Sequence, residues 1–307
     1  MGSQPVGEPP STTRLLDAAS ALNVQRLVAD AARADGFRGL SDQLAADLDD
    51  LVGGRAAPAV VIQIVDEGRT AITGMAIAAQ RDGDWTMQTV TDPHHRDGSA
   101  MLLLVEGLLA AVAGEGGGRV DWWVYAPTAT DEAIAAEHGL RVDRELLLMR
   151  RPLPTERRPE VATRGFRPGD EDAWLAVNNR AFAGHHEQSG WTIETLRQRM
   201  RQPWFDADDL RLHERDGRLA AFCWTKRHDH DHGEIYVIGV DPDFQGLGLG
   251  TQLTLAGLDH LAAAGMTEAL LYVAAENTAA RAMYDRLGFV VDRIDRAYVG
   301  EVLANVE

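Results

Sequence analysis

Segments with two different spacings of hydrophobic residues alternate along this chain. Apolar residues at every second position predict strands, and apolar residues that recur every three or four positions predict helices. In the second half, strands are expected over residues 164–167, 210–215, 218–226, 234–240, 268–273 and 289–299. Helices are expected over residues 170–182, 193–201, 250–264 and 278–286. Helices and strands in this order predict an α/β or α+β layered domain around a mixed sheet.

The two halves of the sequence repeat the same landmarks at a constant distance. Val240-Asp241-Pro242 ends a predicted strand as Val90-Thr91-Asp92-Pro93 does, and the two prolines lie 242 − 93 = 149 residues apart. Leu287-Gly288-Phe289 follows a predicted helix as His138-Gly139-Leu140 does, and 288 − 139 = 149 again. One shift that fits two separated landmarks indicates an internal duplication. A repeat of this length is a whole domain, so a tandem pair is predicted.

Proline-rich segments divide this pair. Residues 1–13 are polar and rich in proline, and we expect them to be disordered. The segment PLPTERRP, from Pro152 to Pro159, lies between two predicted strands and is typical of an interdomain linker. The predicted division is therefore an N-terminal domain over 1–153, a linker over 154–161 and a C-terminal domain over 162–307.

The composition is that of a globular protein with a strong negative charge. The net charge of −17 argues against nucleic acid and anionic membranes as partners. The single cysteine, Cys223, excludes an intramolecular disulfide and favours a reducing compartment. The longest apolar run, 101–113, is too short to cross a bilayer. The first residues lack an apolar stretch of the signal-peptide type, so we expect a cytoplasmic protein.

The most informative segment is a glycine-rich turn between a predicted strand and a predicted helix. Its sequence, Gln245-Gly246-Leu247-Gly248-Leu249-Gly250, lets the backbone approach a ligand without a Cβ between them. The N–H groups and the dipole of the following helix favour an anion such as a pyrophosphate. The turn lacks the Lys-Ser/Thr of a P-loop and fits the dinucleotide fingerprint poorly. Alone, it could equally be a flexible turn or another nucleotide-binding loop.

A second segment, Asn277 to Phe289, has the features of a helix with a polar N-cap and a glycine after its end. By itself it also fits an ordinary capped helix that buries Tyr284. Together, Gln-x-x-Gly-x-Gly after a strand and Asn-x-x-Ala-x-x-x-Tyr-x-x-x-Gly-Phe downstream resemble the GCN5-related N-acetyltransferase superfamily. The resemblance implies two domains of that fold, each a mixed, mostly antiparallel sheet flanked by helices. It also implies acetyl-CoA as co-substrate, with no metal.

The same resemblance assigns the coenzyme site to the second half. It implies that the glycine-rich turn holds the pyrophosphate of acetyl-CoA and that the preceding strand follows the pantetheine arm, with a backbone N–H that polarises the thioester carbonyl. Tyr284 would point at the coenzyme sulfur. The implied coenzyme-binding residues are Ile238, Gly239, Val240, Gln245, Gly246, Leu247, Gly248, Leu249, Gly250, Thr251, Asn277, Thr278, Ala279, Ala280, Arg281 and Ala282. Thr89, Val90 and Thr91 of the first half are weaker candidates.

Further stretches resemble the mycothiol synthase family, tandem-domain members of the superfamily that acetylate the cysteinyl amine of Cys-GlcN-Ins. The stretches are 177–185, 187–191, 204–206, 224–226, 234–242 and 271–273, with 149–153 at the domain junction. The first half otherwise matches only in patches. This resemblance implies a small thiol-sugar as the acceptor. The implied acceptor-site residues are Asp35, Glu187, Lys226, Glu234 and Tyr272. We expect a monomer.

These residues also fit the chemistry without the family. An α-amine has a pKa of about 8 in peptides, and only its neutral form attacks a thioester, so a base is useful. Glu234, at the start of a strand, can take the proton directly or through water, and Tyr284 can protonate the leaving thiolate. Direct attack needs no cysteine or serine nucleophile. The structural alternatives are a solvated carboxylate for Glu234, a surface lysine for Lys226, a polar loop for Glu187 and a core position for Tyr272.

The first half lacks this chemistry. The shift of 149 residues places Trp85 at the position of Glu234. It places Ala135 at the position of Tyr284. The turn before Gly98 is also one residue shorter than its counterpart. Because neither substitute exchanges a proton, we expect a structural or substrate-shaping domain without catalytic activity.

Other interpretations remain open. The run from His228 to His232 alternates His and Asp and could hold a metal, although it falls in an expected polar turn. Cys223 lies within a strand and fits a core position better than a nucleophile. The enzyme could acetylate another amine, such as an antibiotic, a polyamine or a peptide N-terminus. The protein could also sense acetyl-CoA without catalysis, which the presence of both Glu234 and Tyr284 argues against.

Overall fold

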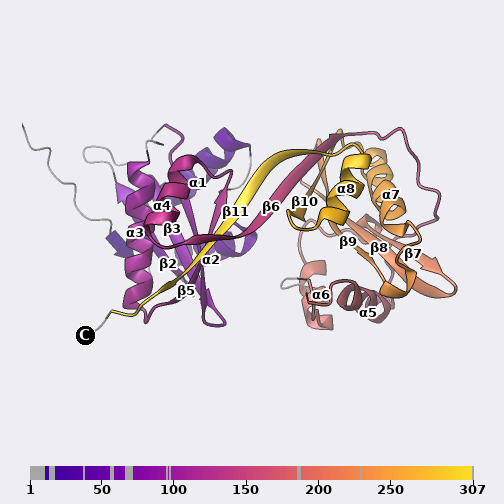
Figure 1. Cartoon of the computed structure of the whole chain (residues 1–307), viewed down its shortest axis with the longest axis horizontal. Helices are drawn as coiled ribbons and strands as arrows, with labels where there is room; N and C mark the ends of the chain where they lie inside the picture. Colours follow the sequence, from indigo (N-terminus) through magenta and orange to yellow (C-terminus); the bar gives the residue numbers. More distant parts are fainter. Residues whose placement is uncertain are drawn as a thin grey trace, which may run out of the picture. The chain divides into compact units, whose positions relative to one another are not determined.

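The computed structural model describes residues 11–13, 18–36, 39–55, 59–65, 72–94, 96, 98–184, 188–228 and 230–305. They form two compact units (Figure 1). The first unit takes the chain up to Glu145 and again from Ile294 onward, and the second takes Leu146–Arg293. In each unit, helices flank a mostly antiparallel sheet that contains one parallel pair of strands. The predicted fold class is therefore confirmed.

The first unit contains a sheet with the order β1-β2-β3-β4-β5-β11. Its strands are β1 (Ser11–Thr13), β2 (Ala59–Val65), β3 (Ile72–Arg81), β4 (Asp84–Thr91), β5 (Gly118–Tyr125) and β11 (Val290–Val302). Its helices are α1 (Ala18–Asp35), α2 (Asp42–Val52), α3 (Ser99–Gly114) and α4 (Ala129–Glu137). The strands β4 and β5 form the parallel pair. The short strand β1 corrects the prediction of disorder over 1–13, because its backbone pairs with β2; residues 1–10 lie outside the described residues.

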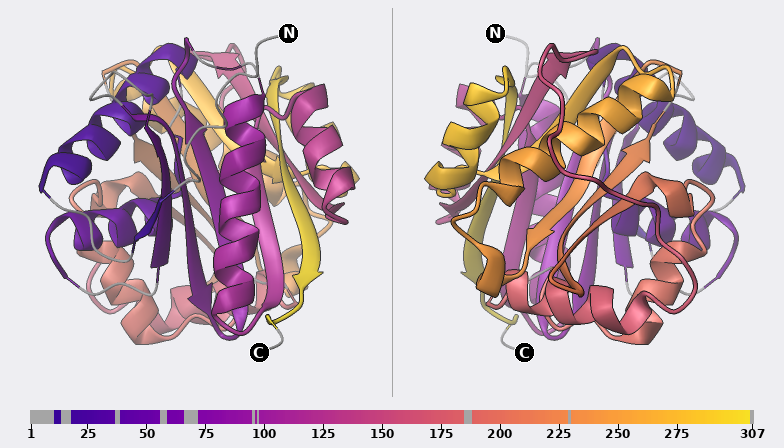
Figure 2. Two further views of the ribbon diagram at one scale, coloured as in Figure 1. Left: turned by 90° about the vertical axis from the view of Figure 1, so that its left-hand side faces the viewer. Right: turned by 90° about the vertical axis from the view of Figure 1, so that its right-hand side faces the viewer.

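Two apolar clusters hold this unit together, one on each face of its sheet. Leu104 and Leu108 of α3 pack with Trp122 of β5 in one cluster, and α3 runs across that face (Figure 2). Helices α1 and α2 contribute the other cluster, against apolar residues of β3 and β4. Trp122 is fully buried and stacks on Tyr298 of β11, with ring centres 5.6 Å apart. Trp122 is therefore a core residue of this unit.

The second unit contains a sheet with the order β6-β10-β9-β8-β7. Its strands are β6 (Arg141–Pro152), β7 (Leu210–Arg215), β8 (Arg218–Arg227), β9 (His232–Val240) and β10 (Glu268–Ala274). Its helices are α5 (Glu171–Ala181), α6 (Ile193–Met200), α7 (Leu249–Ala263) and α8 (Thr278–Arg286), with short 3₁₀ helices at Ala207–Asp209 and Pro242–Phe244. The expected strand over 164–167 is wrong. Only Arg164 bridges to Leu212, and the chain then meets Pro168, which has no N–H to extend a ladder.

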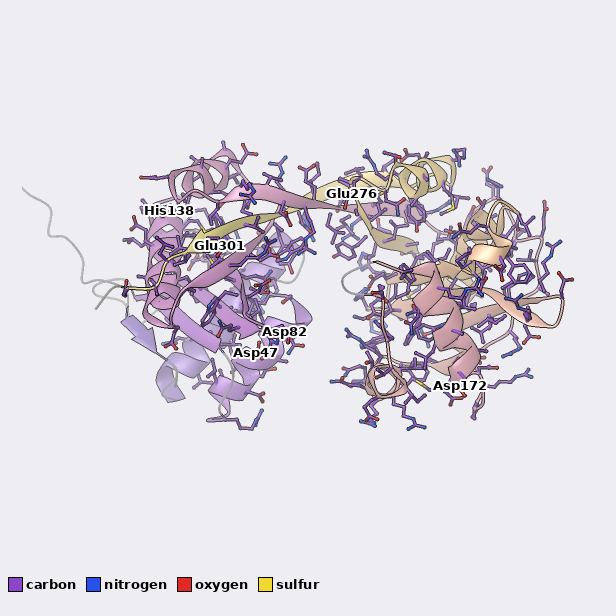
Figure 3. The ribbon with its side chains drawn as sticks, turned by 60° about the horizontal axis from the view of Figure 1, so that its bottom comes forward. Asp47, Asp82, His138, Asp172, Glu276 and Glu301 are labelled. Carbon is purple, nitrogen blue, oxygen red and sulfur yellow. The ribbon has the colours of Figure 1, made fainter. Side chains whose placement is uncertain are left out.

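The second unit also buries an apolar cluster on each face of its sheet. One cluster joins α7 and α8 to the sheet and includes Tyr284 and Cys223. The other joins α5 and α6 to the sheet and is rich in aromatic residues, with Trp174 fully buried at its centre. On the same helix, Asp172 is exposed to solvent (Figure 3). Helices α7 and α8 therefore cover one face of the sheet, and the aromatic cluster with α5 and α6 covers the opposite face.

The final strand of each sequence repeat belongs to the sheet of the other unit. In β6, Leu146–Pro152 pair with the whole of β10. In β11, Asp295–Val302 pair with β5. The compact units consequently differ from the predicted division into 1–153, 154–161 and 162–307. A local hydrophobic pattern predicts that a segment is a strand, but it does not specify the partner strand.

Candidate functional site

The glycine-rich turn joins β9 to the N-terminus of α7. Gly246 and Gly248 have φ angles of +77° and +76°, a conformation that residues with a Cβ rarely adopt. A Cβ built on either glycine would have nothing within 4 Å. Gly248 is the N-cap of α7 and makes no side-chain hydrogen bond, so no capping side chain satisfies the first N–H groups of the helix. The turn has the features of an anion-binding helix start, as the sequence predicts.

Helix α8 is fixed by two hydrogen bonds near its start. The side-chain oxygen of Asn277 accepts from the backbone N–H of Ala280 at 3.1 Å, so Asn277 is the N-cap that its position predicts. The Arg281 guanidinium donates to the carbonyl oxygen of Ala275 at 2.7 Å. Both residues therefore have structural contacts, and their predicted contacts with a coenzyme remain predictions.

Tyr284 projects from α8 into the apolar cluster beneath the turn. The side chain is only 5% exposed, and its ring meets Phe289 edge to face with ring centres 5.7 Å apart. Burial raises the pKa of the Tyr284 hydroxyl above its usual value, so the hydroxyl stays protonated at neutral pH. The hydrogen bonds of the described residues include none to this hydroxyl, which leaves the proton available to a ligand.

Glu234 lies where the parallel pairing of β9 and β10 ends. The register runs from His232 beside Glu268 to Glu234 beside Leu270 and goes no further. The Glu234 side chain is 9% exposed, and its Oε2 accepts a hydrogen bond from Nε2 of His228 at 2.6 Å. Because a buried carboxylate without partners is costly, this hydrogen bond stabilises Glu234 in place. The structural alternative of a solvated carboxylate is wrong for Glu234.

Lys226 lies opposite Glu234 on the neighbouring strand. The two residues are register partners in the antiparallel pair of β8 and β9, so their side chains project from one face. Lys226 is buried, and its Nζ lies 4.8 Å from the ring centre of Trp204 and 5.6 Å from that of Tyr236. No role was predicted for either ring, although Trp204 and Tyr236 both lie in stretches that resemble the mycothiol synthase family. The alternative of an ordinary surface lysine is wrong.

A β-bulge beside this point changes which residues of β9 face each side. The register between β8 and β9 shifts between Trp224 and Thr225, which pair with Val237 and Ile235. Beyond the shift, Val237 packs in the aromatic cluster and Ile238 packs against the cluster of α7 and α8. Bulges of this kind occur beside active sites, where they re-aim neighbouring groups. The sequence pattern gave no signal for it.

Three further residues were predicted to belong to the acceptor site. Tyr272 of β10 is 41% exposed, which excludes the core position considered for it. Glu187 lies outside the described residues. Asp35 lies at the end of α1 and forms two hydrogen bonds of 2.8 Å with the guanidinium of Arg96. The acceptor-site role of all three remains a prediction.

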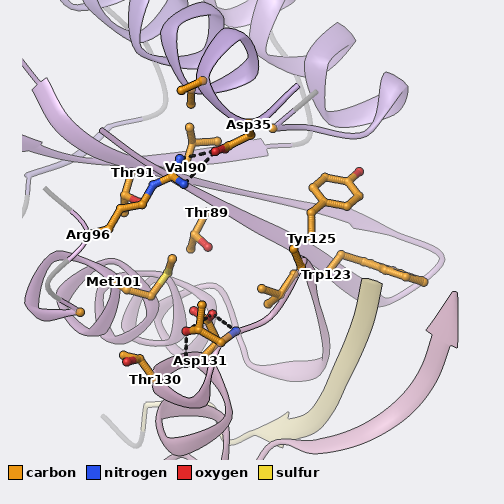
Figure 4. Close-up of a pocket in the computed structure, with 17 residues that line it drawn as sticks. Asp35, Thr89, Val90, Thr91, Arg96, Met101, Trp123, Tyr125, Thr130 and Asp131 are labelled. Carbon is orange, nitrogen blue, oxygen red and sulfur yellow. Dashed lines mark hydrogen bonds and ion pairs between the residues drawn. The ribbon is translucent and has the colours of Figure 1, made fainter. Parts of the chain in front are cut away.

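The first unit has a pocket of about 450 Å³ at the position that corresponds to the glycine-rich turn (Figure 4). The three weaker coenzyme candidates, Thr89, Val90 and Thr91, line it from β4. The Asp35–Arg96 ion pair lies in its wall (Figure 4). An arginine that already has a carboxylate partner offers less attraction to a phosphate than a free one does.

Cys223 agrees with its structural interpretation, and two histidines of the His-rich run contact separate carboxylates. Cys223 is fully buried in β8, and burial raises the pKa of its thiol to about 12, which makes it a poor nucleophile. His228 and His232 contact different carboxylates, Glu234 and Glu268. No group of residues suited to hold a metal occurs within the described ranges, of which Asp229 is not a part. Across these same ranges, no helix is long and apolar enough to cross a membrane.

Comparisons with known proteins bear on the family and the fold of this chain. The model of the acetyltransferase (GNAT) family matches residues 173–289. Among solved structures, a GCN5-related N-acetyltransferase from Sphaerobacter thermophilus superposes with a TM-score of 0.68 at 20% identity over 99% of both chains. A tandem GNAT protein from the clavulanic acid biosynthesis pathway gives a TM-score of 0.66 at 17% identity, over 96% of this chain and 100% of that one. These two structures support the fold.

Curated relatives extend the match along the chain. A mycothiol acetyltransferase from Thermomonospora curvata is 48% identical over 62% of this chain and 67% of its own length. Those from Acidothermus cellulolyticus and Streptomyces coelicolor are 39% and 40% identical and cover 86% and 90% of both chains. The residues that the family model matches, 173–289, include the glycine-rich turn and α8. The protein is therefore an acetyltransferase with the GNAT fold, and it belongs to the mycothiol acetyltransferase family.

Proposed function

We propose that the protein transfers the acetyl group of acetyl-CoA to the cysteinyl amine of Cys-GlcN-Ins, giving mycothiol and CoA. One observation carries the proposal: a buried carboxylate, Glu234, lies where β9 and β10 part, on the strand that leads into the glycine-rich turn. The proposed base lies on β9, and the proposed anion site lies in the turn that follows β9. The names of the curated relatives supply the acceptor.

The coenzyme would bind along this strand and turn. Its pyrophosphate is an anion of the kind that the open N-terminus of α7 attracts, and the absence of Cβ atoms at Gly246 and Gly248 leaves space for it. The pantetheine arm carries amide groups that can form hydrogen bonds with backbone groups of Ile238 to Val240. These residues follow Glu234, the last residue of β9 in register with β10, so β10 does not pair with them. A backbone N–H in this stretch would stabilise the negative charge that develops on the thioester oxygen.

The side chains then supply the proton transfers. The neutral amine attacks the thioester carbonyl, and Glu234 takes the proton that the nitrogen loses, directly or through one water. The carbon–sulfur bond breaks, and the thiolate takes a proton from Tyr284, which solvent later replaces. A tyrosine that stays protonated at neutral pH is suited to this donation. Transfer is direct within a ternary complex, since the buried thiol of Cys223 is not placed to act as a nucleophile.

The acceptor would lie on the face that carries Glu234 and Lys226. Lys226 is held among aromatic rings and can donate to hydroxyl groups of the sugar. Tyr272, Glu187 and Asp35 are further proposed contacts. We also propose a monomeric, cytoplasmic protein in which the first domain has no catalytic activity.

A panel of acceptors tests this function. Purified protein with acetyl-CoA is offered Cys-GlcN-Ins, a polyamine, an aminoglycoside and a dipeptide, and release of CoA is followed with a thiol-independent assay by mass spectrometry. We expect kcat/KM for Cys-GlcN-Ins to exceed that for each other amine by at least about a hundredfold, the discrimination that several buried polar contacts provide. Equal or higher kcat/KM for another amine would assign a different acceptor.

A further inference from the structure

The His-rich run from His228 to His232 has one member that the proposed reaction does not yet use. His228 lies on the turn between β8 and β9, and its Nε2 is 2.6 Å from Oε2 of Glu234. His232 instead lies 3.5 Å from Glu268. Only His228 of these two therefore touches the proposed base.

We infer that His228 is a positioning residue, which holds the Glu234 carboxylate in the orientation that accepts the proton of the amine. The inference rests on the proposed role of Glu234 as base. The imidazole N–H donates to Oε2, so this oxygen is occupied and Oε1 is left to face the substrate. A carboxylate fixed at one oxygen loses less rotational freedom in the transition state than one that turns freely.

The surroundings make this hydrogen bond effective. The Glu234 side chain is only 9% exposed, so water competes little at the carboxylate, while the His228 side chain, at 29%, meets it from the more open side. A hydrogen bond to a charged acceptor in such a place is stronger than one at an open surface. Lys226 of β8 is the register partner of Glu234 and projects from the same face. The contact from His228 is directional, because its donor atom lies in a planar ring.

The contact through Nε2 gives a test by side-chain length. The amide nitrogen of Gln reaches about as far as Nε2 of His, whereas that of Asn reaches only as far as Nδ1. We expect His228→Gln to keep kcat within about threefold of wild type. His228→Asn and His228→Ala should lower kcat by about ten- to a hundredfold, the factor associated with a hydrogen bond to a charged group. The KM for the acceptor and the affinity for acetyl-CoA should change little.

Two controls separate positioning from a structural role. His230→Ala, an exposed position on the same turn, should behave as wild type. In a Glu234→Ala background, His228→Ala should cause no further loss of kcat, because a residue that acts through Glu234 has nothing left to act on. Calorimetric acetyl-CoA binding and thermal unfolding of each full-length variant show whether the fold is kept.

Each result decides the inference. Low kcat for Ala and Asn, recovery by Gln and no further loss in the double variant support it. Wild-type kcat for His228→Ala, equal loss for Gln and Ala, loss of stability together with coenzyme binding, or an additive loss in the double variant each overturn it. If the wild type prefers a simple amine to Cys-GlcN-Ins, the proposed acceptor is wrong, and the same comparison is made with that amine.

Discussion

The two sequence repeats have one backbone plan and different chemistry. Helix α4 begins at Ala129 and α8 at Thr278, and 278 − 129 = 149, the shift found in the sequence. In each repeat, two strands pair in parallel over three register positions. The first strand of each pair is followed by a turn that ends in a glycine N-cap at positive φ, Gly98 before α3 and Gly248 before α7. A glycine N-cap at positive φ thus begins the helix in both copies.

The side chains at the key positions differ completely. Trp85, at the position of Glu234, is buried, and its indole N–H donates to the carbonyl of Gly117 at 3.3 Å. Ala135, at the position of Tyr284, is a core residue. In the first repeat these positions serve packing, so the fold tolerates loss of the proton-transfer groups. The comparison supports the proposal that the first repeat is structural, because the two positions proposed to exchange protons in the second repeat are core positions in the first.

The largest of the following effects should come from the proton donor. Tyr284→Phe removes only a hydroxyl and should lower kcat by about 10² or more, with little change in coenzyme affinity. Tyr298→Phe, a buried tyrosine of the first unit, is the matched control and should keep full turnover. Single-turnover measurement isolates the chemical step from product release. An unchanged single-turnover rate in Tyr284→Phe would remove the donor from the mechanism.

A smaller effect, on coenzyme affinity, is expected from a substitution in the glycine-rich turn. Gly248→Glu places a side chain and a negative charge in the space proposed for the pyrophosphate, and should weaken acetyl-CoA binding about ten- to a hundredfold. Gly265→Glu carries the same backbone cost, since Gly265 also has positive φ and open space, but it lies at the other end of α7. Calorimetry on both variants compares them. Equal loss of affinity in the two would indicate a general effect of backbone strain.

The smallest effect concerns the exchange of strands between repeats. Segment 162–307 lacks the part of β6 that pairs with β10, whereas segment 146–293 contains it. We expect 146–293 to unfold at a temperature higher by about 5 °C or more, and to bind acetyl-CoA more tightly. Circular dichroism melts and calorimetry of the two segments test this. Equal melting temperatures would show that the exchanged strand contributes little.

Local sequence patterns predicted the elements of the second half well. Helix α8 has the predicted bounds, because an Asn N-cap and a following glycine mark both of its ends. The expected strand over 164–167 was wrong because four residues carry too little pattern to outweigh the glycine among them and the proline that follows. The duplication itself was visible because both copies kept the same lengths between landmarks.

What the sequence could not predict depends on contacts between distant residues. The exchange of β6 and β11 involves partners more than a hundred residues apart, and no local period encodes that choice. The contact between His228 and Glu234 depends on the curvature of a turn that the run of His and Asp does not specify. The motifs thus predicted candidate residues, and the contacts of those residues became visible only in the fold.

The central claim is that the second repeat alone performs acetyl transfer. The most direct test is kcat for Cys-GlcN-Ins in full-length Glu234→Gln, which keeps the size of the side chain and its capacity for hydrogen bonds but cannot take a proton. We predict a loss of about 10² to 10⁴ in kcat with unchanged acetyl-CoA affinity. Retention of half the wild-type kcat would mean that the first repeat, or another base, carries out the reaction, and it would contradict the account.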